Sequence, residues 1–280
     1  MLTRRNFLIS SSLGLLGSAL YARLLEPGWL DLTHHRVPFF KDPGSSLRIL
    51  HLSDLHYSDV VPLPVIQSAI QLGLEQKPDL VCLTGDYMTA PLPGYEAYVE
   101  TLKVLSAQCP VFACLGNHDY QRPGRTSVPP EVKNKLVMPA LLKASGIQLL
   151  NNQMQVLQLE GRSLQVAGLG DFWAGKCLPE KAFATGKSNL PTLLLSHNPD
   201  SKSRVGSYPW NLMLCGHSHG GQLKIPFYGA IHAPIEDFGY IEGLNAWKDR
   251  LIYTTRGVGN LHGIRFNCRP EVSVLELMSF

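Results

Sequence analysis

Hydrophobic and polar positions divide most of the chain into short continuous apolar runs and amphipathic segments. Five apolar runs of four to six residues have the pattern of β-strands covered on both faces. They lie at residues 47–52, 80–83, 111–115, 192–195 and 211–215. Helical spacing of apolar residues between the first three runs predicts helices from Pro64 to Pro78 and over 95–108. This succession of strands and helices is typical of an α/β fold.

Shorter elements are predicted around this framework. Strands are expected at residues 30–37, 147–150, 154–159, 163–167, 223–225, 251–254, 264–267 and 272–277. A helix over 131–145 must bend or break at Pro139, because proline lacks the N–H that a helix interior uses. A short helix is expected over 176–186. A chain of 280 residues with 45% apolar composition suits one or two domains, and we expect a single catalytic domain at 26–280.

Each of the five apolar runs is followed by a small residue and then by Asp, Asn or His. The polar residues at these positions are Asp54, His56, Asp86, Asn117, His118, His197, His217 and His219. In α/β sheets, functional sites gather at the carboxyl ends of strands. Burying carboxylates and imidazoles together is costly without a cation, and this set offers more ligands than a tetrahedral zinc ion uses. It therefore favours two divalent metal ions joined by one carboxylate, an arrangement suited to phosphoryl chemistry.

Composition narrows the classes of function. The net charge is +3 and no basic block stands out, so the sequence has no electrostatic footprint for nucleic-acid binding. The six cysteines are scattered without a C-x-x-C motif, and Cys82, Cys114 and Cys215 lie inside apolar runs. These three are expected to be small buried side chains rather than members of a disulfide framework.

The first 25 residues are interpreted as an export signal or membrane anchor. The segment from Thr3 to Leu8 resembles a twin-arginine signal, which a receptor reads, and an apolar segment follows over residues 7–25. Cleavage near Gly17-Ser18-Ala19 would remove it, whereas the uncleaved segment could anchor the chain. We expect the twin-arginine export machinery as a partner, membrane association, and a location in the periplasm or at the outer face of the cytoplasmic membrane. A chance Arg-Arg pair before a buried helix would give the same pattern.

The strand-end motifs, in their order and spacing, resemble those of the calcineurin-like metallophosphoesterases. The motifs are Asp54-x-His56, Gly85-Asp86, Gly116-Asn117-His118-Asp119, Ser196-His197 and Gly216-His217-Ser218-His219. The twin-arginine start, Asn198-Pro199-Asp200 and Gly220-Gly221-Gln222 resemble the YaeI/YkuE-like phosphodiesterase branch. The resemblance covers about residues 47–222 by motif. It implies a four-layer αββα sandwich of two mixed β-sheets flanked by helices.

The resemblance also implies a role for each strand-end residue. One metal would be held by Asp54, His56 and His219, the second by Asn117, His197 and His217, and Asp86 would bridge the two. The two divalent ions would be Mn, Zn, Fe or Mg, which all accept N and O ligands. A hydroxide between them would attack a phosphodiester or pyrophosphate in line. His118 would assist as electrostatic stabiliser or acid, held protonated by Asp119.

Several substrates and activities stay open. A phosphodiester-containing small molecule or a lipid is favoured. Apolar residues 62–65 and 225–228 follow ligand motifs closely, and they are expected to form a lip beside the site, which would suit a lipid, or, for half of them, to pack in the core. A related branch includes a UDP-diacylglucosamine pyrophosphatase of lipid A synthesis, whose cytoplasmic active site conflicts with export. Phosphomonoesterase activity, protein phosphatase activity and non-catalytic envelope binding also stay open. Outside the motifs, His51 is expected to be structural. Arg256 and Arg265 are expected to form surface pairs or to clamp a phosphate, and His232 and His262 to lie in loops or at the rim of the site.

Overall fold

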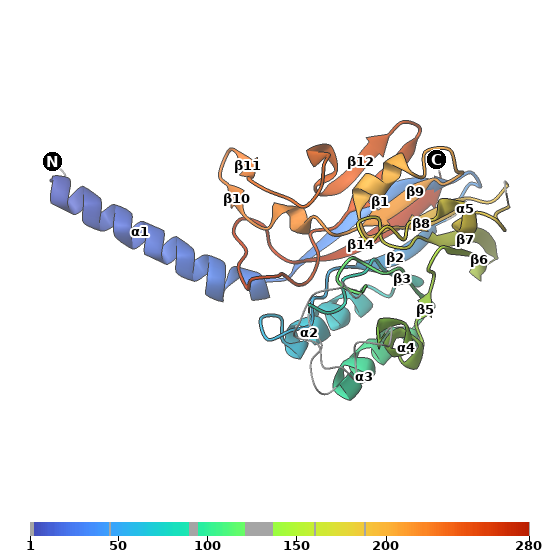
Figure 1. Cartoon of the computed structure of the whole chain (residues 1–280), viewed down its shortest axis with the longest axis horizontal. Helices are drawn as coiled ribbons and strands as arrows, with labels where there is room; N and C mark the ends of the chain where they lie inside the picture. The colour runs from blue at the N-terminus through green and yellow to red at the C-terminus, as the bar shows by residue number, and fades with distance from the viewer. Residues whose placement is uncertain are drawn as a thin grey trace.

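The computed structural model is an α/β structure built on two six-stranded sheets. It describes residues 3–44, 46–89, 95–120, 137–159, 161–187 and 189–279. Figure 1 shows the sheets stacked together, with helix α1 (Arg4–Leu24) projecting away from them. The candidate site lies where parallel strands of both sheets end, so the strand order determines which loops meet there.

The first sheet has the strand order β1-β14-β2-β3-β4-β5. Its strands are β1 (Asp31–Phe40), β2 (Ser46–Leu52), β3 (Leu80–Leu83), β4 (Val111–Ala113), β5 (Gln148–Leu149) and β14 (Glu271–Ser279). Strands β2 to β5 run parallel, whereas β14 pairs antiparallel with β2 and parallel with β1. The parallel arrangement brings the carboxyl ends of β2, β3 and β4 to one edge.

The second sheet has the strand order β12-β13-β9-β8-β7-β6. Its strands are β6 (Gln153–Leu159), β7 (Arg162–Gly168), β8 (Thr192–Leu195), β9 (Leu212–Cys215), β12 (Gly243–Trp247) and β13 (Arg250–Thr254). The four central strands run parallel and the two edge strands antiparallel to them. A separate hairpin consists of β10 (Lys224–Ile225) and β11 (Gly229–Ala230).

Apolar side chains fill the space between the sheets, which explains the continuous apolar runs. In β2, Ile49 packs between the sheets with Leu193 and Leu214, whereas Leu50 and Leu52 pack toward the helices. These helices are α2 (Leu63–Leu74), α3 (Tyr95–Ser106) and α4 (Val137–Ala144). The short α5 (Pro179–Ala182) and the 3₁₀ helix η2 (Pro199–Ser203) are the thin helical layer on the second sheet. The predicted four-layer αββα architecture is therefore confirmed.

The predicted strand over 264–267 was wrong. The described backbone there makes only an isolated bridge between Phe266 and Leu223, because the segment folds around the buried side chain of Arg265. Strands β11 and β12 were not predicted. Of the helix predicted over 131–145, residues 131–136 lie outside the described part of the chain.

The described side chains of helix α1 are mostly exposed, which contradicts a buried helix after a chance Arg-Arg pair. Its last turn is nevertheless fixed to the body, since the backbone N–H of Arg265 donates to Ala22 O at 2.9 Å and the rings of Tyr21 and Phe266 meet edge to face. Among the helices described, none combines the length and the apolar character needed to cross a bilayer. The division into a signal at 1–25 and a domain at 26–280 stays a prediction.

Candidate metal centre

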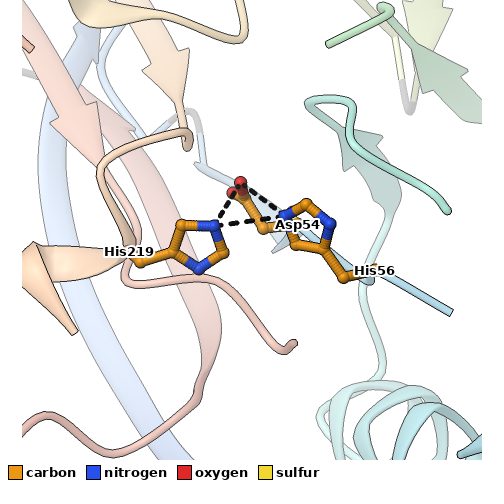
Figure 2. Close-up of side chains that lie close together, drawn as sticks. All are labelled: Asp54, His56 and His219. Atoms are coloured by element: carbon orange, nitrogen blue, oxygen red, sulfur yellow. Dashed lines mark hydrogen bonds and ion pairs between the residues drawn. The ribbon is translucent and has the colours of Figure 1, made fainter. Parts of the chain in front are cut away.

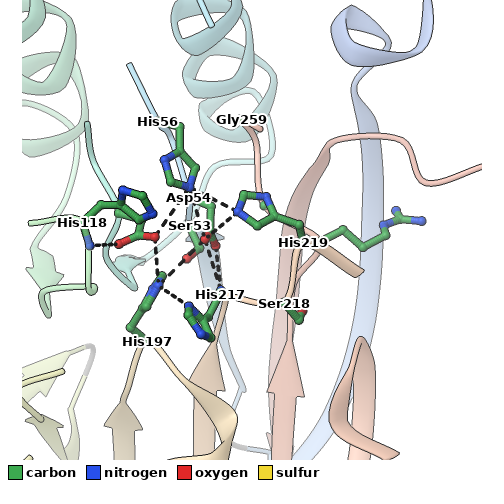
Figure 3. A network of polar contacts seen from close by, with 12 residues as sticks. Ser53, Asp54, His56, His118, His197, His217, Ser218, His219 and Gly259 are labelled. Atoms are coloured by element: carbon green, nitrogen blue, oxygen red, sulfur yellow. Dashed lines mark hydrogen bonds and ion pairs between the residues drawn. The ribbon is translucent and has the colours of Figure 1, made fainter. Parts of the chain in front are cut away.

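The residues predicted at the five strand ends converge on one buried site. They follow β2, β3 and β4 of the first sheet and β8 and β9 of the second, and Figure 3 shows most of them in one network of polar contacts. The residues Asp54, His56, Asp86, His197, His217 and His219 are all at most 5% exposed. The spatial convergence that the sequence pattern predicted is thus present.

The first cluster consists of Asp54, His56 and His219 (Figure 2). The Nε2 atoms of His56 and His219 face each other at 3.2 Å. Oδ1 of Asp54 lies 3.4 Å from His219 Nε2 and 3.8 Å from His56 Nε2. Burial lowers the pKa of both imidazoles to about 3, so both rings are neutral, the form that binds a metal.

The second cluster consists of Asp86, His197 and His217. Nε2 of His197 lies 3.1 Å from Asp86 Oδ2 and 3.1 Å from His217 Nδ1. The clusters adjoin, because the same Oδ2 of Asp86 is also 3.5 Å from His56 Nε2 in the first cluster. Asp86 therefore stands between the two groups of imidazoles.

The ring of His197 is held with Nε2 toward the carboxylates. Its Nδ1 lies 2.6 Å from the carbonyl oxygen of Thr84, which can only accept, so Nδ1 carries a proton. Burial disfavours a charge on His197, but the carboxylates of Asp86 and Asp54 outweigh burial and raise its pKa to about 10. The position between these carboxylates thus attracts positive charge, as a metal site must.

A polar atom without a protein partner tests whether a metal fits these residues. Within the predicted ligand set, Asn117 Oδ1 is a buried oxygen that makes no hydrogen bond to protein. An unpartnered buried polar atom is costly, and the imidazoles beside it turn His217 Nδ1 and His219 Nε2 toward the clusters. The donor set is oxygen and imidazole nitrogen, which divalent ions accept. The residues therefore fit a metal.

The backbone at the site adopts strained conformations. Of the eleven non-glycine residues with positive φ among the residues described, five are predicted ligands. They are Asp54, His56, Asp86, His217 and His219, with φ between 48° and 70°. A conformation of this kind costs about 1–3 kcal/mol where it is sparsely populated, and such residues cluster at functional sites. This concentration is an indication of function that is independent of the motifs.

Two glycines let the carboxylates approach the neighbouring strand ends. A Cβ on Gly116 would overlap Asp86 Oδ1, and one on Gly216 would overlap Asp54 Oδ2. The backbone N–H groups after these glycines hold the same carboxylates, with His118 N donating to Asp86 Oδ1 at 2.9 Å and His217 N to Asp54 Oδ2 at 3.0 Å. Gly116 and Gly216 therefore each have a steric reason to lack a side chain.

His118 lies half-buried beside the first cluster. Its ring meets the His56 ring edge to face, with centroids 5.0 Å apart. Asp119 acts on the backbone instead: its carboxylate accepts the N–H groups of Asp86, Tyr87 and Gly116 at 2.8–3.0 Å. These bonds make Asp119 a residue that positions the site loops. That Asp119 also keeps His118 protonated stays a prediction.

Sequence reasoning missed a sixth strand end. Strand β7 is followed by Leu169-Gly170-Asp171, the same pattern of small residue and acid. Asp171 is buried and accepts from Ala174 N at 2.6 Å, and its charge contributes to the raised pKa of His197. In the same loop, the half-exposed Trp173 sets its ring edge to face against His217, with centroids 4.4 Å apart. This loop forms a wall of the site beside the second cluster.

The structure also shows where the singled-out residues outside the motifs lie. The predicted surface pairing of Arg265 was wrong, because its guanidinium is fully buried and donates to the carbonyl oxygens of Cys268, Arg256, Gly257 and Gly259. Arg256 pairs with Asp31 and Glu271.

His51 is structural as expected, buried against Thr84 Oγ1 at 2.8 Å. His232 and His262 are exposed, and all six cysteines are free.

Two adjoining clusters of carboxylates and imidazoles at the ends of parallel strands define a metal-dependent phosphoric ester hydrolase. The chain belongs to the calcineurin-like phosphoesterase family, whose family model matches residues 47–221. It is 48% identical to the phosphodiesterase YaeI of Escherichia coli K12, over 99% of this chain and 100% of that protein.

Two more distant relatives cover almost the same length. The uncharacterised metallophosphoesterase YkuE of Bacillus subtilis is 33% identical, over 92% of this chain and 89% of that protein. The UDP-2,3-diacylglucosamine pyrophosphatase LpxG of Chlamydia trachomatis serovar D is 30% identical, over 92% of each. The predicted family is confirmed.

Proposed function

We propose that this protein is a binuclear metal-dependent phosphodiesterase. The observation that carries the proposal is the shared position of Asp86, whose Oδ2 lies within 3.5 Å of an imidazole nitrogen of each cluster. A carboxylate in this place suits two cations a short distance apart. Similarity to a relative described as a phosphodiesterase supports the diester as substrate.

In this proposal, the two clusters hold one metal each. The first metal would be held by Asp54, His56 and His219, and the second by His197, His217 and the unpartnered Oδ1 of Asn117, with Asp86 between the two clusters as a ligand available to both. The metals are drawn from Mn, Zn, Fe and Mg, since imidazole and oxygen ligands serve all four in some geometry. When bound, such a pair lowers the pKa of water and offsets phosphate charge.

Protein groups supply the rest of the chemistry. His118 stands at the half-exposed side of the site, where it stabilises charge on the phosphate or donates a proton to the leaving oxygen. The carboxylate of Asp119 holds the loops of Asp86 and Gly116 in place, because it accepts a backbone N–H from each. In the second cluster, the ring of Trp173 shields His217 from solvent.

We further propose that the chain is exported and acts on a lipid- or envelope-linked diester. The Arg4-Arg5 pair at the start of α1 supports recognition by twin-arginine machinery and a location in the periplasm or at the outer membrane face. A relative that bears the name of a diacylglucosamine pyrophosphatase supports a lipid-linked substrate. Exposed apolar residues that follow the His219 loop in the sequence, including Phe227, are consistent with such a substrate.

Hydrolysis of a chromogenic diester tests the proposal. We expect the purified protein to cleave bis(p-nitrophenyl) phosphate faster than p-nitrophenyl phosphate, to lose this activity in EDTA and to regain it when Mn²⁺ or Zn²⁺ is added back, since both clusters need a cation. Absence of metal-dependent turnover on either compound would contradict the proposal. Preference for the monoester would favour a phosphomonoesterase instead.

Metal content tests the division of the ligands. We expect His217→Ala and His219→Ala each to retain about one metal per chain, because each substitution removes a ligand from one cluster and leaves the other complete. The double variant should lose both. Elemental analysis of the purified proteins measures this, with the exposed His34→Ala as a control that keeps the parent content. Loss of both metals from either single variant would show that the clusters are one unit.

A further inference from the structure

An exposed apolar hairpin follows directly after the metal-binding loop. Strands β10 and β11 are joined by Pro226-Phe227-Tyr228. Of these residues, Phe227 is fully exposed and Tyr228 is 77% exposed. Leu223, Ile225 and Ile231 are also exposed. Phe227 has a φ of 66°, an unusual conformation for a bulky residue. Such an exposed cluster is typical of an interaction surface.

Helix α1 adds a second exposed apolar stripe at the same end of the molecule (Figure 1). Leu13, Leu16, Leu20 and Leu24 follow at intervals of three or four residues, and all four side chains are exposed. Residues at such spacing lie along one face of a helix. The stripe therefore presents a row of leucines to the surroundings.

The hairpin and α1 are attached to the same segment, residues 262–268. On one side, Lys224 N donates to Phe266 O at 2.9 Å and Phe266 N to Gln222 O at 3.0 Å. On the other side, the Phe266 ring packs on Tyr21 and Arg265 N donates to Ala22 O. The two apolar features are therefore joined through a short fixed segment.

The charges around both features suit an anionic partner. Residues 3–25 and 222–235 contain no Asp or Glu. Residues 3–25 carry Arg4, Arg5 and Arg23, whereas Lys224 of the hairpin is ion-paired with Glu242. Exposed apolar side chains together with basic residues and no acidic ones are the composition of surfaces that bind anionic lipid bilayers. We infer that the β10–β11 hairpin and the leucine stripe of α1 form one surface that docks on an anionic phospholipid bilayer, with the hairpin tip inserted among the lipids.

Docking would place the metal centre at the lipid headgroups. Only residues 220–223 separate His219 from strand β10, and Cys268 Sγ lies 3.3 Å from His219 O and 3.5 Å from Gly220 O. The hairpin and a ligand loop are therefore both bonded to the segment 262–268. This consequence, presentation of a lipid-linked diester to the metals, rests on the proposed function, whereas bilayer docking itself does not.

Vesicle binding by the full-length chain tests the docking surface. We expect the protein to co-sediment with vesicles of phosphatidylglycerol and phosphatidylethanolamine, and the double variant Phe227→Asn/Tyr228→Ser to bind them at least about 10-fold more weakly, since it removes two aromatic anchors. Asparagine tolerates the positive φ at position 227. Val104→Ser, which removes an exposed apolar side chain from α3, should bind like the parent. Circular dichroism and metal content confirm that each variant is folded.

Three outcomes would overturn the inference. The first is parental vesicle binding by the double variant. The second is equal binding to vesicles of phosphatidylcholine alone, which lack the anionic charge. The third is a dimer in light scattering that the double variant disperses, together with no vesicle binding, because the occupant would then be a second copy of the chain. Since no turnover is measured, inactivity on diesters would refute the proposed function and leave bilayer docking intact.

Discussion

Asp86→Ala should remove most of the bound metal and lower diester hydrolysis by at least about 10³-fold. Asp86 is the only carboxylate in the described structure whose single oxygen lies within 3.5 Å of imidazole nitrogens of both clusters. Its loss would deprive both metals of a ligand and leave His56 and His197 without the nearer of the two carboxylates that they face. Elemental analysis and the rate on bis(p-nitrophenyl) phosphate measure the two effects.

Two further variants sharpen this test. Asp86→Asn keeps an acceptor for the His118 N–H but removes the charge, so it should retain more metal than the alanine variant and still lose most of the activity. Asp59→Ala removes an exposed carboxylate near the same loop and should match the parent in both measurements. Two metals per chain and a parental rate in Asp86→Ala would refute the bridging role.

The strand ends could be predicted because one physical rule produces both the strands and the ligand positions. Strands covered on both faces must be continuously apolar, so the first polar residues after each run mark the sheet edge. Parallel pairing then brings these residues together, as in the neighbouring strands β2 and β3 that deliver Asp54 and Asp86. The same rule applies to β7 and Asp171, but glycines and Gln165 interrupt that run and conceal it.

Features that depend on tertiary partners could not be read from the pattern. The alternation at 264–267 favours a strand, yet four carbonyl oxygens from other parts of the loops fix the buried Arg265. Likewise, the composition does not reveal that the carboxylate of Asp119 accepts the backbone N–H groups of Asp86 and Tyr87. The positive φ of the ligands is also imposed by the packed loops, since histidine has no local preference strong enough to require it.

Two apolar segments that follow ligand motifs, residues 225–228 and 62–65, have similar compositions but different positions in the structure. The sequence predicts apolar residues 225–228 as a lip beside the site, and they do follow the His219 loop. Residues 62–65 differ, because they open helix α2 and Leu63 and Val65 pack against the core of the first sheet. Only the structure separates the exposed segment from the packed one.

His118→Ala should keep both metals and lower kcat on diesters by about 10²–10⁴-fold, the usual contribution of a general acid or base. The side chain contacts the His56 ring, whereas its bond to Asp86 is made by the backbone N–H, which the substitution retains. The metal ligands should therefore keep their positions while the substrate loses a partner. Elemental analysis and steady-state kinetics separate these effects, with His34→Ala as the matched control.

The leaving group distinguishes the two roles open to His118. If His118 donates a proton to the leaving oxygen, His118→Ala should harm a phenyl diester more than a p-nitrophenyl diester, because the more acidic nitrophenol leaves without help. If it only stabilises charge on the phosphate, the two substrates should lose the same factor. Loss of metal from His118→Ala would contradict both roles and make His118 part of the metal site, where its edge-to-face contact with His56 would then be the structural link.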